Sequence, residues 1–132
     1  MPDEPPRQPS PRQPLGILLI SGGHERGHYA FILAAAAAAI GRPVTIFATN
    51  EGCRMLASQL PDDARDGQVR AAGVAGLGEL RDAAAELGVR LMACDAGLRM
   101  VDLPSSRLLP DVEIAGVPSF LAAVGEGQII TL

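Results

Sequence analysis

The sequence predicts an open α/β sandwich, in which a mostly parallel sheet of about five strands lies between layers of helices. Two observations favour this class. From residue 15 to the end of the chain, short apolar runs alternate with helix-forming segments, and strands at such spacing pair in parallel through right-handed crossovers. The length of 132 residues also fits one domain, because a single core typically serves about 100–150 residues.

The first fourteen residues differ in composition from the rest of the chain. Six of the eleven prolines lie there, among charged and polar side chains. Such a segment buries too little apolar surface to offset its loss of conformational entropy. We therefore expect a disordered, proline-rich tail over residues 1–14 and a single domain over residues 15–132.

The domain is expected to begin with a strand and a helix. Residues 15–21 (LGILLIS) form a continuous apolar run that stops at Gly22 and Gly23, which is typical of a strand covered on both faces. Residues 28–40 are rich in alanine and are followed by Gly41, which predicts a helix that ends there.

The next segment repeats the alternation and then becomes polar. Residues 44–49 (VTIFAT) form a second β-branched run, and Asn50 is a suitable N-cap for a short helix that extends to residue 60. Residues 61–73 are polar and are predicted to form a loop.

The C-terminal half supplies the remaining elements. We expect a helix over residues 77–87, with Leu80, Ala84 and Leu87 on its buried face, and a third strand over residues 89–94. Asp95 would cap a helix over 96–103. The final elements are a short strand at 112–114, a helix at 118–124 and a closing strand at 128–132. The result is a three-layer sandwich of flavodoxin-like size.

Composition disfavours several classes of function. All eleven basic residues are arginine, so the chain has neither a Schiff-base lysine nor a P-loop. With four aromatic residues and a net charge of −4, it lacks the basic, aromatic surface that binds nucleic acid. The longest apolar stretch, residues 29–40, is too short to span a membrane. No signal peptide is recognisable, and two cysteines are too few for a disulfide framework, so we expect a cytoplasmic protein.

The predicted topology brings three loops together. Parallel sheets of this kind bind ligands beyond the carboxyl ends of their strands. Residues 22–28, 49–53 and 94–98 each follow a predicted strand. Both cysteines, Cys53 and Cys94, lie in this set. We therefore expect a site where these loops meet.

The first loop contains a sequence that resembles a zinc motif. His24-Glu25-Arg26-Gly27-His28 matches H-E-x-x-H, in which two histidines on one helical face hold zinc. Here the segment is expected to be a loop that leads into the first helix, and the chain has no third histidine. A zinc hydrolase is therefore the least favoured enzyme, and no metal ligand is predicted. The same glycine-rich turn is a weak candidate for holding an anion on its backbone amides.

The two cysteines are the candidates for chemistry. Cys94 lies between a strand and a helix, where backbone amides stabilise a thiolate. Asp95 opposes this effect, and Arg99, four residues later, would neutralise Asp95. Cys53 is a candidate resolving thiol for a disulfide with Cys94. For Cys94 the alternative is a buried residue that acts as a small hydrophobe. For Cys53 the alternative is an incidental, half-exposed cysteine.

Four blocks of the chain resemble the DsrE/DsrF-like family of small sulfur-relay proteins. They are residues 18–41 (LLISGGHERGHYAFILAAAAAAIG), 44–52 (VTIFATNEG), 86–103 (ELGVRLMACDAGLRMVDL) and 111–132 (DVEIAGVPSFLAAVGEGQIITL). The resemblance implies an α/β sandwich, assembly into trimers or hexamers, and a persulfide carried on the cysteine that matches Cys94. Two features differ from the family pattern: Asp95-Ala96-Gly97-Leu98 replaces a Met-Ser-Met-like stretch, and residues 50–53 replace an aromatic-rich segment.

The function predicted from these observations is a sulfur carrier or sulfurtransferase-like protein. Cys94 would take sulfur from a donor protein and pass it to an acceptor thiol, with no cofactor. The candidate site combines the thiols of Cys94 and Cys53 with ligand-binding positions, namely Gly22, Gly23, His24, His28, Asn50 and Asp95. Two alternatives remain: an oligomeric module that binds a small ligand without catalysis, and a redox protein that uses a Cys53–Cys94 pair.

Overall fold

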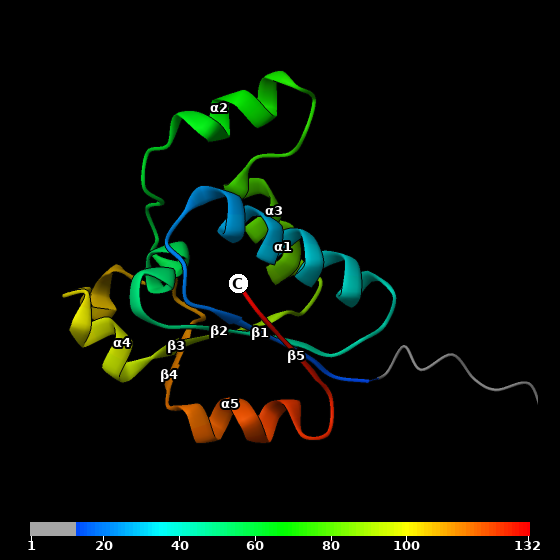
Figure 1. Cartoon of the computed structure of the whole chain (residues 1–132), viewed down its shortest axis with the longest axis vertical. Coiled ribbons are helices and arrows are strands. Elements are labelled where there is room, and N and C mark those ends of the chain that lie inside the picture. The colour runs from blue at the N-terminus through cyan, green and yellow to red at the C-terminus, as the bar shows by residue number, and fades with distance from the viewer. Residues whose placement is uncertain (1–12) are drawn as a thin grey trace, which may run out of the picture.

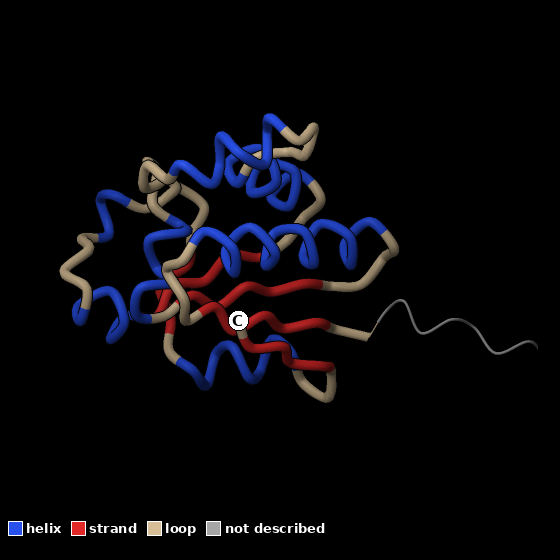
Figure 2. The backbone as a smooth tube through the Cα atoms, turned by 45° about the horizontal axis from the view of Figure 1, so that its top comes forward, coloured by secondary structure: helices blue, strands red, loops and turns tan. Residues whose placement is uncertain are grey.

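The computed structural model describes residues 13–132 and confirms the three-layer α/β sandwich (Figures 1 and 2). Its five-stranded sheet is parallel throughout and has the order β4-β3-β2-β1-β5. The predicted tail over residues 1–14 lies almost entirely outside the described part of the chain. The strands are β1 (Leu15–Leu19), β2 (Val44–Ala48), β3 (Arg90–Cys94), β4 (Glu113–Ala115) and β5 (Gln128–Thr131).

The strand order explains how the helices are divided between the two faces of the sheet. From β1 to β4 each new strand is added on the same side of the previous one, whereas β5 returns to pair with β1. Crossovers between parallel strands are right-handed. When the direction in which strands are added across the sheet reverses, the connecting helix therefore lies on the other face of the sheet. Accordingly, α1 (His24–Ala39) and α3 (Leu77–Glu86) cover one face, and α5 (Val117–Val124) covers the other (Figure 1).

Two groups of buried side chains follow this division. The larger core includes Ile17, Phe31 and Ile46 and fills the space between the sheet and the α1/α3 layer. The smaller one lies under α5, where Phe47 and Phe120 stack with ring centroids 5.1 Å apart. The strand β2 is buried at all five positions, as its continuous apolar sequence predicts.

The expectation of a loop over residues 61–73 was wrong. Residues Ala64–Ala71 form the helix α2, which Asp63 caps by accepting a hydrogen bond from the Arg65 amide. No residue of this helix is buried, so it has no apolar face for a periodicity argument to detect. Polar contacts of Asp66 with His24 and Leu77, and of Arg70 with Glu79, hold it instead.

The buried face of α3 also differs from the expected one. Its buried residues are Leu77, Arg81 and Ala84, and Leu87 is half exposed. Arg81 is a charged residue at a core position because its guanidinium donates hydrogen bonds to the carbonyl oxygens of Met55 and Ala57. A hydrophobicity pattern cannot anticipate such a residue, since its partners are backbone atoms distant in sequence.

Two glycine substitutions should have opposite effects on stability. A Cβ at Gly52 would overlap the carbonyl oxygen of Leu19, so Gly52→Ala should lower the free energy of unfolding by about 3 kcal/mol. Gly67, in the exposed helix α2, has open space around its Cα, and Gly67→Ala should raise it by about 0.5–1 kcal/mol. Urea denaturation measures both changes. If both substitutions changed the free energy of unfolding by the same amount, the result would contradict the close approach of Gly52 to the Leu19 carbonyl oxygen.

Candidate functional site at the strand ends

The segment that follows β2 crosses the carboxyl end of β1. The amide of Thr49 donates to the Leu19 carbonyl, and the amide of Gly52 donates to the carbonyls of Ile20 and Thr49, all at 2.9 Å. This segment then forms the 3-10 helix η1 (Asn50–Leu56). The backbone of β1 therefore fixes the position of η1.

The other two predicted loops pack against the start of η1. A Cβ at Gly97 would lie 2.6 Å from the Asn50 amide nitrogen, and one at Gly22 would lie 2.9 Å from the Glu51 carbonyl oxygen. Any side chain at these two positions would force Asn50 or Glu51 to move, so both positions require glycine. The three loops that the sequence placed at one edge thus meet in the structure.

Asn50 does not act as the expected N-cap. Thr49 is the residue before η1, and no side chain caps that helix. Asn50 instead adopts a left-handed conformation with φ of 51°, which asparagine tolerates better than most residues. Its Oδ1 accepts a hydrogen bond from the Thr49 hydroxyl. The role of Asn50 is therefore to turn the chain where β2 ends.

Cys94 is the last residue of β3 and the N-cap of α4 (Asp95–Met100). Its Sγ accepts a hydrogen bond from the Gly97 amide at 3.4 Å. The side chain belongs to the smaller core with Phe47, Met92 and Phe120, and the residue is 8% exposed. The thiol is therefore placed between a backbone donor and an apolar wall, with little of its surface open to solvent.

The two charged residues next to this thiol pair as expected. The Arg99 guanidinium donates to the Asp95 carboxylate at 2.8 Å, and both side chains are mostly exposed. The prediction that Asp95 caps the helix was wrong, because Cys94 occupies the cap position. Asp95 is thus held by Arg99 on the surface of α4.

Cys53 has a different environment. It is 0% exposed, belongs to the larger core, and its thiol donates to the Ala48 carbonyl oxygen at 3.5 Å. Burial raises the pKa of the Cys53 thiol from 9.0 to about 11, and the neighbouring Cys94 thiol contributes to the rise. At neutral pH Cys53 is therefore a protonated thiol inside the protein, which is a poor nucleophile.

The two cysteines are close but lie in separate groups of side chains. Cys53 packs in the α1/α3 layer, and Cys94 packs in the α5 layer. Both thiols are free. The pairing of Cys53 with Cys94 stays a prediction, as does a catalytic role for either residue.

The two histidines lie on one face of α1. The helix begins at His24, with Gly23 as its N-cap, so the expected start at residue 28 was wrong. The rings of His24 and His28 stack with centroids 5.3 Å apart. The Nε2 of His24 is 2.9 Å from the Asp66 carboxylate, and the Nε2 of His28 is 2.8 Å from the Ala75 carbonyl oxygen. These contacts attach α1 to α2 and to the turn before α3.

In this arrangement, His24 and His28 hold neighbouring segments together. Within residues 13–132, no group of three histidine, cysteine, aspartate or glutamate side chains is placed to hold a metal ion. The Asp66 carboxylate accepts hydrogen bonds from the Leu77 amide and from His24, which lowers the pKa of Asp66. Asp66 thus connects α1, α2 and α3 through one carboxylate.

Two cavities lie beside this region, and Cys94 lines neither of them. The larger, of about 720 Å³, lies between η1 and the segment after α4, and its lining includes Arg54, Leu103 and Arg107. The smaller, of about 360 Å³, lies against α2, and its lining includes His24 and Asp66. The sequence analysis missed the larger cavity, because residues 103–107 gave no motif that would place them next to η1.

Comparison with known proteins identifies the family of this chain. The sequence model that describes the DsrE/DsrF-like family matches residues 15–132. The chain belongs to the DsrE/DsrF-like family. Among similar proteins, the sulfur carrier protein DsrE2 of Allochromatium vinosum is 25% identical over 150 aligned positions, which cover 87% of this chain and 94% of DsrE2. The uncharacterized protein YrkE of Bacillus subtilis is 28% identical over 147 positions, which cover 86% of this chain and 92% of YrkE.

Solved structures share the fold of this DsrE/DsrF-like chain. The ychN protein of E. coli superposes with a TM-score of 0.65 at 12% identity, covering 91% of this chain and 99% of ychN. The protein of unknown function MTH1491 from Methanobacterium thermoautotrophicum gives a TM-score of 0.58 at 17% identity, covering 90% of this chain and 98% of its own. None of the helices in residues 13–132 has the length and apolar character that crossing a membrane requires.

The raised pKa of Cys53 should make stability depend on pH in the alkaline range. Between pH 9 and 11 the unfolded chain loses the Cys53 proton while the folded chain keeps it. The free energy of unfolding should therefore fall as pH rises through this range. Urea denaturation of the wild type and Cys53→Ala from pH 8 to 11 measures the effect. The variant should show a shallower fall, and identical slopes would contradict the prediction.

Proposed function

We propose that the protein is a sulfur carrier that holds a persulfide on Cys94. The observation that carries the proposal is the position of this thiol at the junction of β3 and α4, within hydrogen-bond distance of the Gly97 amide. Membership of the DsrE/DsrF-like family and the similarity to a sulfur carrier support it. Cys53, the other thiol, is fully buried and protonated at neutral pH.

The transfer needs no oxidant or cofactor. The Cys94 thiolate attacks the terminal sulfur of a donor persulfide, a new S–S bond forms on Cys94, and the donor leaves as a thiolate. An acceptor thiolate then attacks the same terminal sulfur and releases Cys94 as a thiolate. The Gly97 amide is positioned to stabilise negative charge on the Cys94 sulfur at the start and end of this cycle.

The low exposure of Cys94 restricts how the donor approaches. With 8% of the residue exposed, a persulfide sulfur reaches the thiol only as a narrow group presented at the strand ends. Gly22 lets the first loop approach Glu51 of η1 closely, and Asp95 with Arg99 forms the charged surface next to the thiol. We assign these groups to the docking of donor and acceptor proteins.

Persulfide loading tests this function. After incubation with a small persulfide donor, intact-mass analysis should show an adduct of ~32 Da, one sulfur atom. Cys94→Ser should never gain it, whereas Cys53→Ala should gain it as the wild type does. Addition of an acceptor thiol should remove it. Absence of the adduct from the folded wild-type protein, or its presence in Cys94→Ser, would contradict the proposal.

We also propose that the protein assembles with copies of itself through the α5 face. Val117 and Leu121 on α5 are each about half exposed, and so is Ile129 on β5. Strand β5 is one edge of the sheet. Its Ile129 pairs with Gly16, whose Cα faces Phe120 and Val124 of α5, the helix that covers this face (Figure 2). The family resemblance, which implies trimers or hexamers, favours a second copy as the partner for these side chains.

A matched pair of leucines tests this assembly. Leu121→Asp on α5 should shift the protein to a lower mass in analytical ultracentrifugation, because a carboxylate would be buried without a partner in the interface. Leu87→Asp, at the C-terminal cap of α3, changes a leucine of similar exposure, 48% against 51%, in the layer on the opposite face of the sheet. It should leave the mass unchanged. A wild-type protein that sediments as a monomer would refute the assembly.

A further inference from the structure

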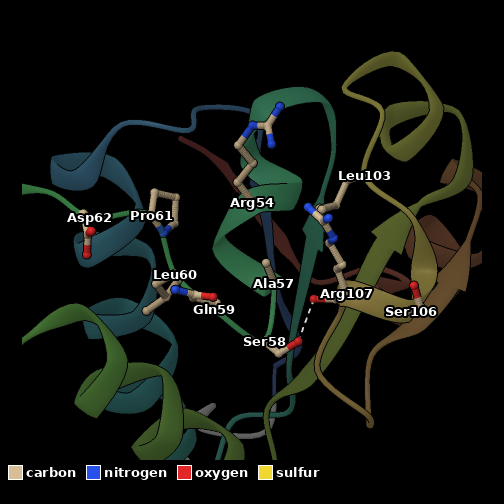
Figure 3. A pocket seen from close by; sticks show the side chains of 10 residues that line it. All are labelled: Arg54, Ala57, Ser58, Gln59, Leu60, Pro61, Asp62, Leu103, Ser106 and Arg107. Atoms are coloured by element: carbon tan, nitrogen blue, oxygen red, sulfur yellow. Dashed lines mark hydrogen bonds between the residues drawn. The ribbon is translucent and has the colours of Figure 1, made fainter.

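The larger cavity has a composition that suits a ligand with both a charged and an apolar part. It lies between residues 54–62 and residues 103–107, and its volume of about 720 Å³ falls in the range of small-molecule sites. Figure 3 shows Arg54 above the cavity, Leu60, Pro61 and Asp62 on one side, and Leu103, Ser106 and Arg107 on the other. None of these residues belongs to the persulfide site at Cys94.

The two arginines in the lining retain donors for a ligand. Arg54 uses its Nε for Glu51 and its Nη2 for the Val101 carbonyl, at 2.7 and 3.1 Å. In the described part of the chain, the Arg107 side chain makes no hydrogen bond or ion pair, while its carbonyl accepts from the Ser58 hydroxyl at 2.8 Å. A guanidinium offers five N–H donors. The N–H donors of Arg54 and Arg107 that make no contact within residues 13–132 are suited to bind a phosphate or a carboxylate.

A third guanidinium lies beneath the cavity. Arg81 is 6% exposed, and its Nη1 donates to the carbonyl oxygens of Met55 and Ala57 at 3.0 and 2.6 Å. Ala57 lines the cavity. The Arg81 Nε is a buried donor without a partner among residues 13–132. Both acceptors are neutral carbonyls, and Asp82 is the carboxylate that acts on the buried charge of Arg81.

The lining of the cavity carries a positive excess, because it contains two arginines, Arg54 and Arg107, and one carboxylate, Asp62. Outside the lining, Glu51 pairs with Arg54, and Asp82 acts on the buried Arg81. The apolar part of the lining comes from Ala57, Leu60, Pro61 and Leu103. The arrangement matches a molecule with an anionic group at one end and a short apolar body.

We propose that this cavity is a second binding site, independent of Cys94, for a small organic anion that carries a phosphate or carboxylate group. The anionic group binds Arg54 and Arg107, and the apolar body lies on Leu60 and Leu103. Arg54 also holds the Val101 carbonyl at the end of α4.

Titration with hexyl phosphate, followed by amide and arginine Nε–H NMR signals, tests the site. In a buffer free of phosphate and sulfate, the signals of Arg54 and Arg107 should shift with saturation and a Kd of about 1 mM. Inorganic phosphate, which lacks the apolar part, should bind more weakly, and 1-hexanol should not shift the arginine signals. No saturable shift up to about 20 mM hexyl phosphate would overturn the proposal.

Charge-removing variants localise the binding. Arg107→Gln removes a guanidinium without internal contacts and should weaken binding about fivefold. Arg26→Gln, an exposed position on α1 outside the cavity, makes the same change of charge and should have no effect. Equal weakening by both variants would show general attraction of anions and overturn the site. Cys94→Ser should bind hexyl phosphate like the wild type, so the result does not depend on persulfide loading.

Discussion

The backbone junction between the end of β1 and the start of η1 determines where the functional groups lie. At Gly52 one amide donates to two carbonyl oxygens, those of Ile20 and Thr49, and its Cα packs against the Leu19 carbonyl. This junction turns the chain across the carboxyl ends of the strands. Gly97 then packs on Asn50, which fixes the first turn of α4 and with it Cys94. A side chain at either glycine would separate these layers.

The same junction gives the two thiols opposite chemical environments. Cys53 follows Gly52 directly, so it points into the larger core, where burial keeps it protonated. Cys94 ends β3 on the side of α5 and receives an amide hydrogen bond instead. Two residues that the fold brings close together therefore differ in their surroundings, because the sheet separates the two groups of buried side chains.

Much of the fold could be predicted from the sequence, since its strands are continuous apolar runs that end in glycine or polar turns. All five strands lie within one or two residues of their expected bounds. What the sequence analysis missed depends on polar contacts between distant segments. Helix α2 has no buried face, Arg81 is buried through carbonyls of another element, and the histidines bind Asp66 and Ala75. Periodicity carries no information on such contacts.

The lack of a buried face on α2 has a consequence for the surface around both cavities. Residues Leu60, Pro61 and Asp62 line both of them and lead directly into this helix. Since α2 buries no apolar side chain, its opening exposes little hydrophobic surface and costs little free energy compared with opening the sheet. The shared wall is thus joined to a helix that polar contacts of Asp66 and Arg70 hold in place. A change that breaks these contacts would act on the wall of both cavities and leave the strands and their core in place.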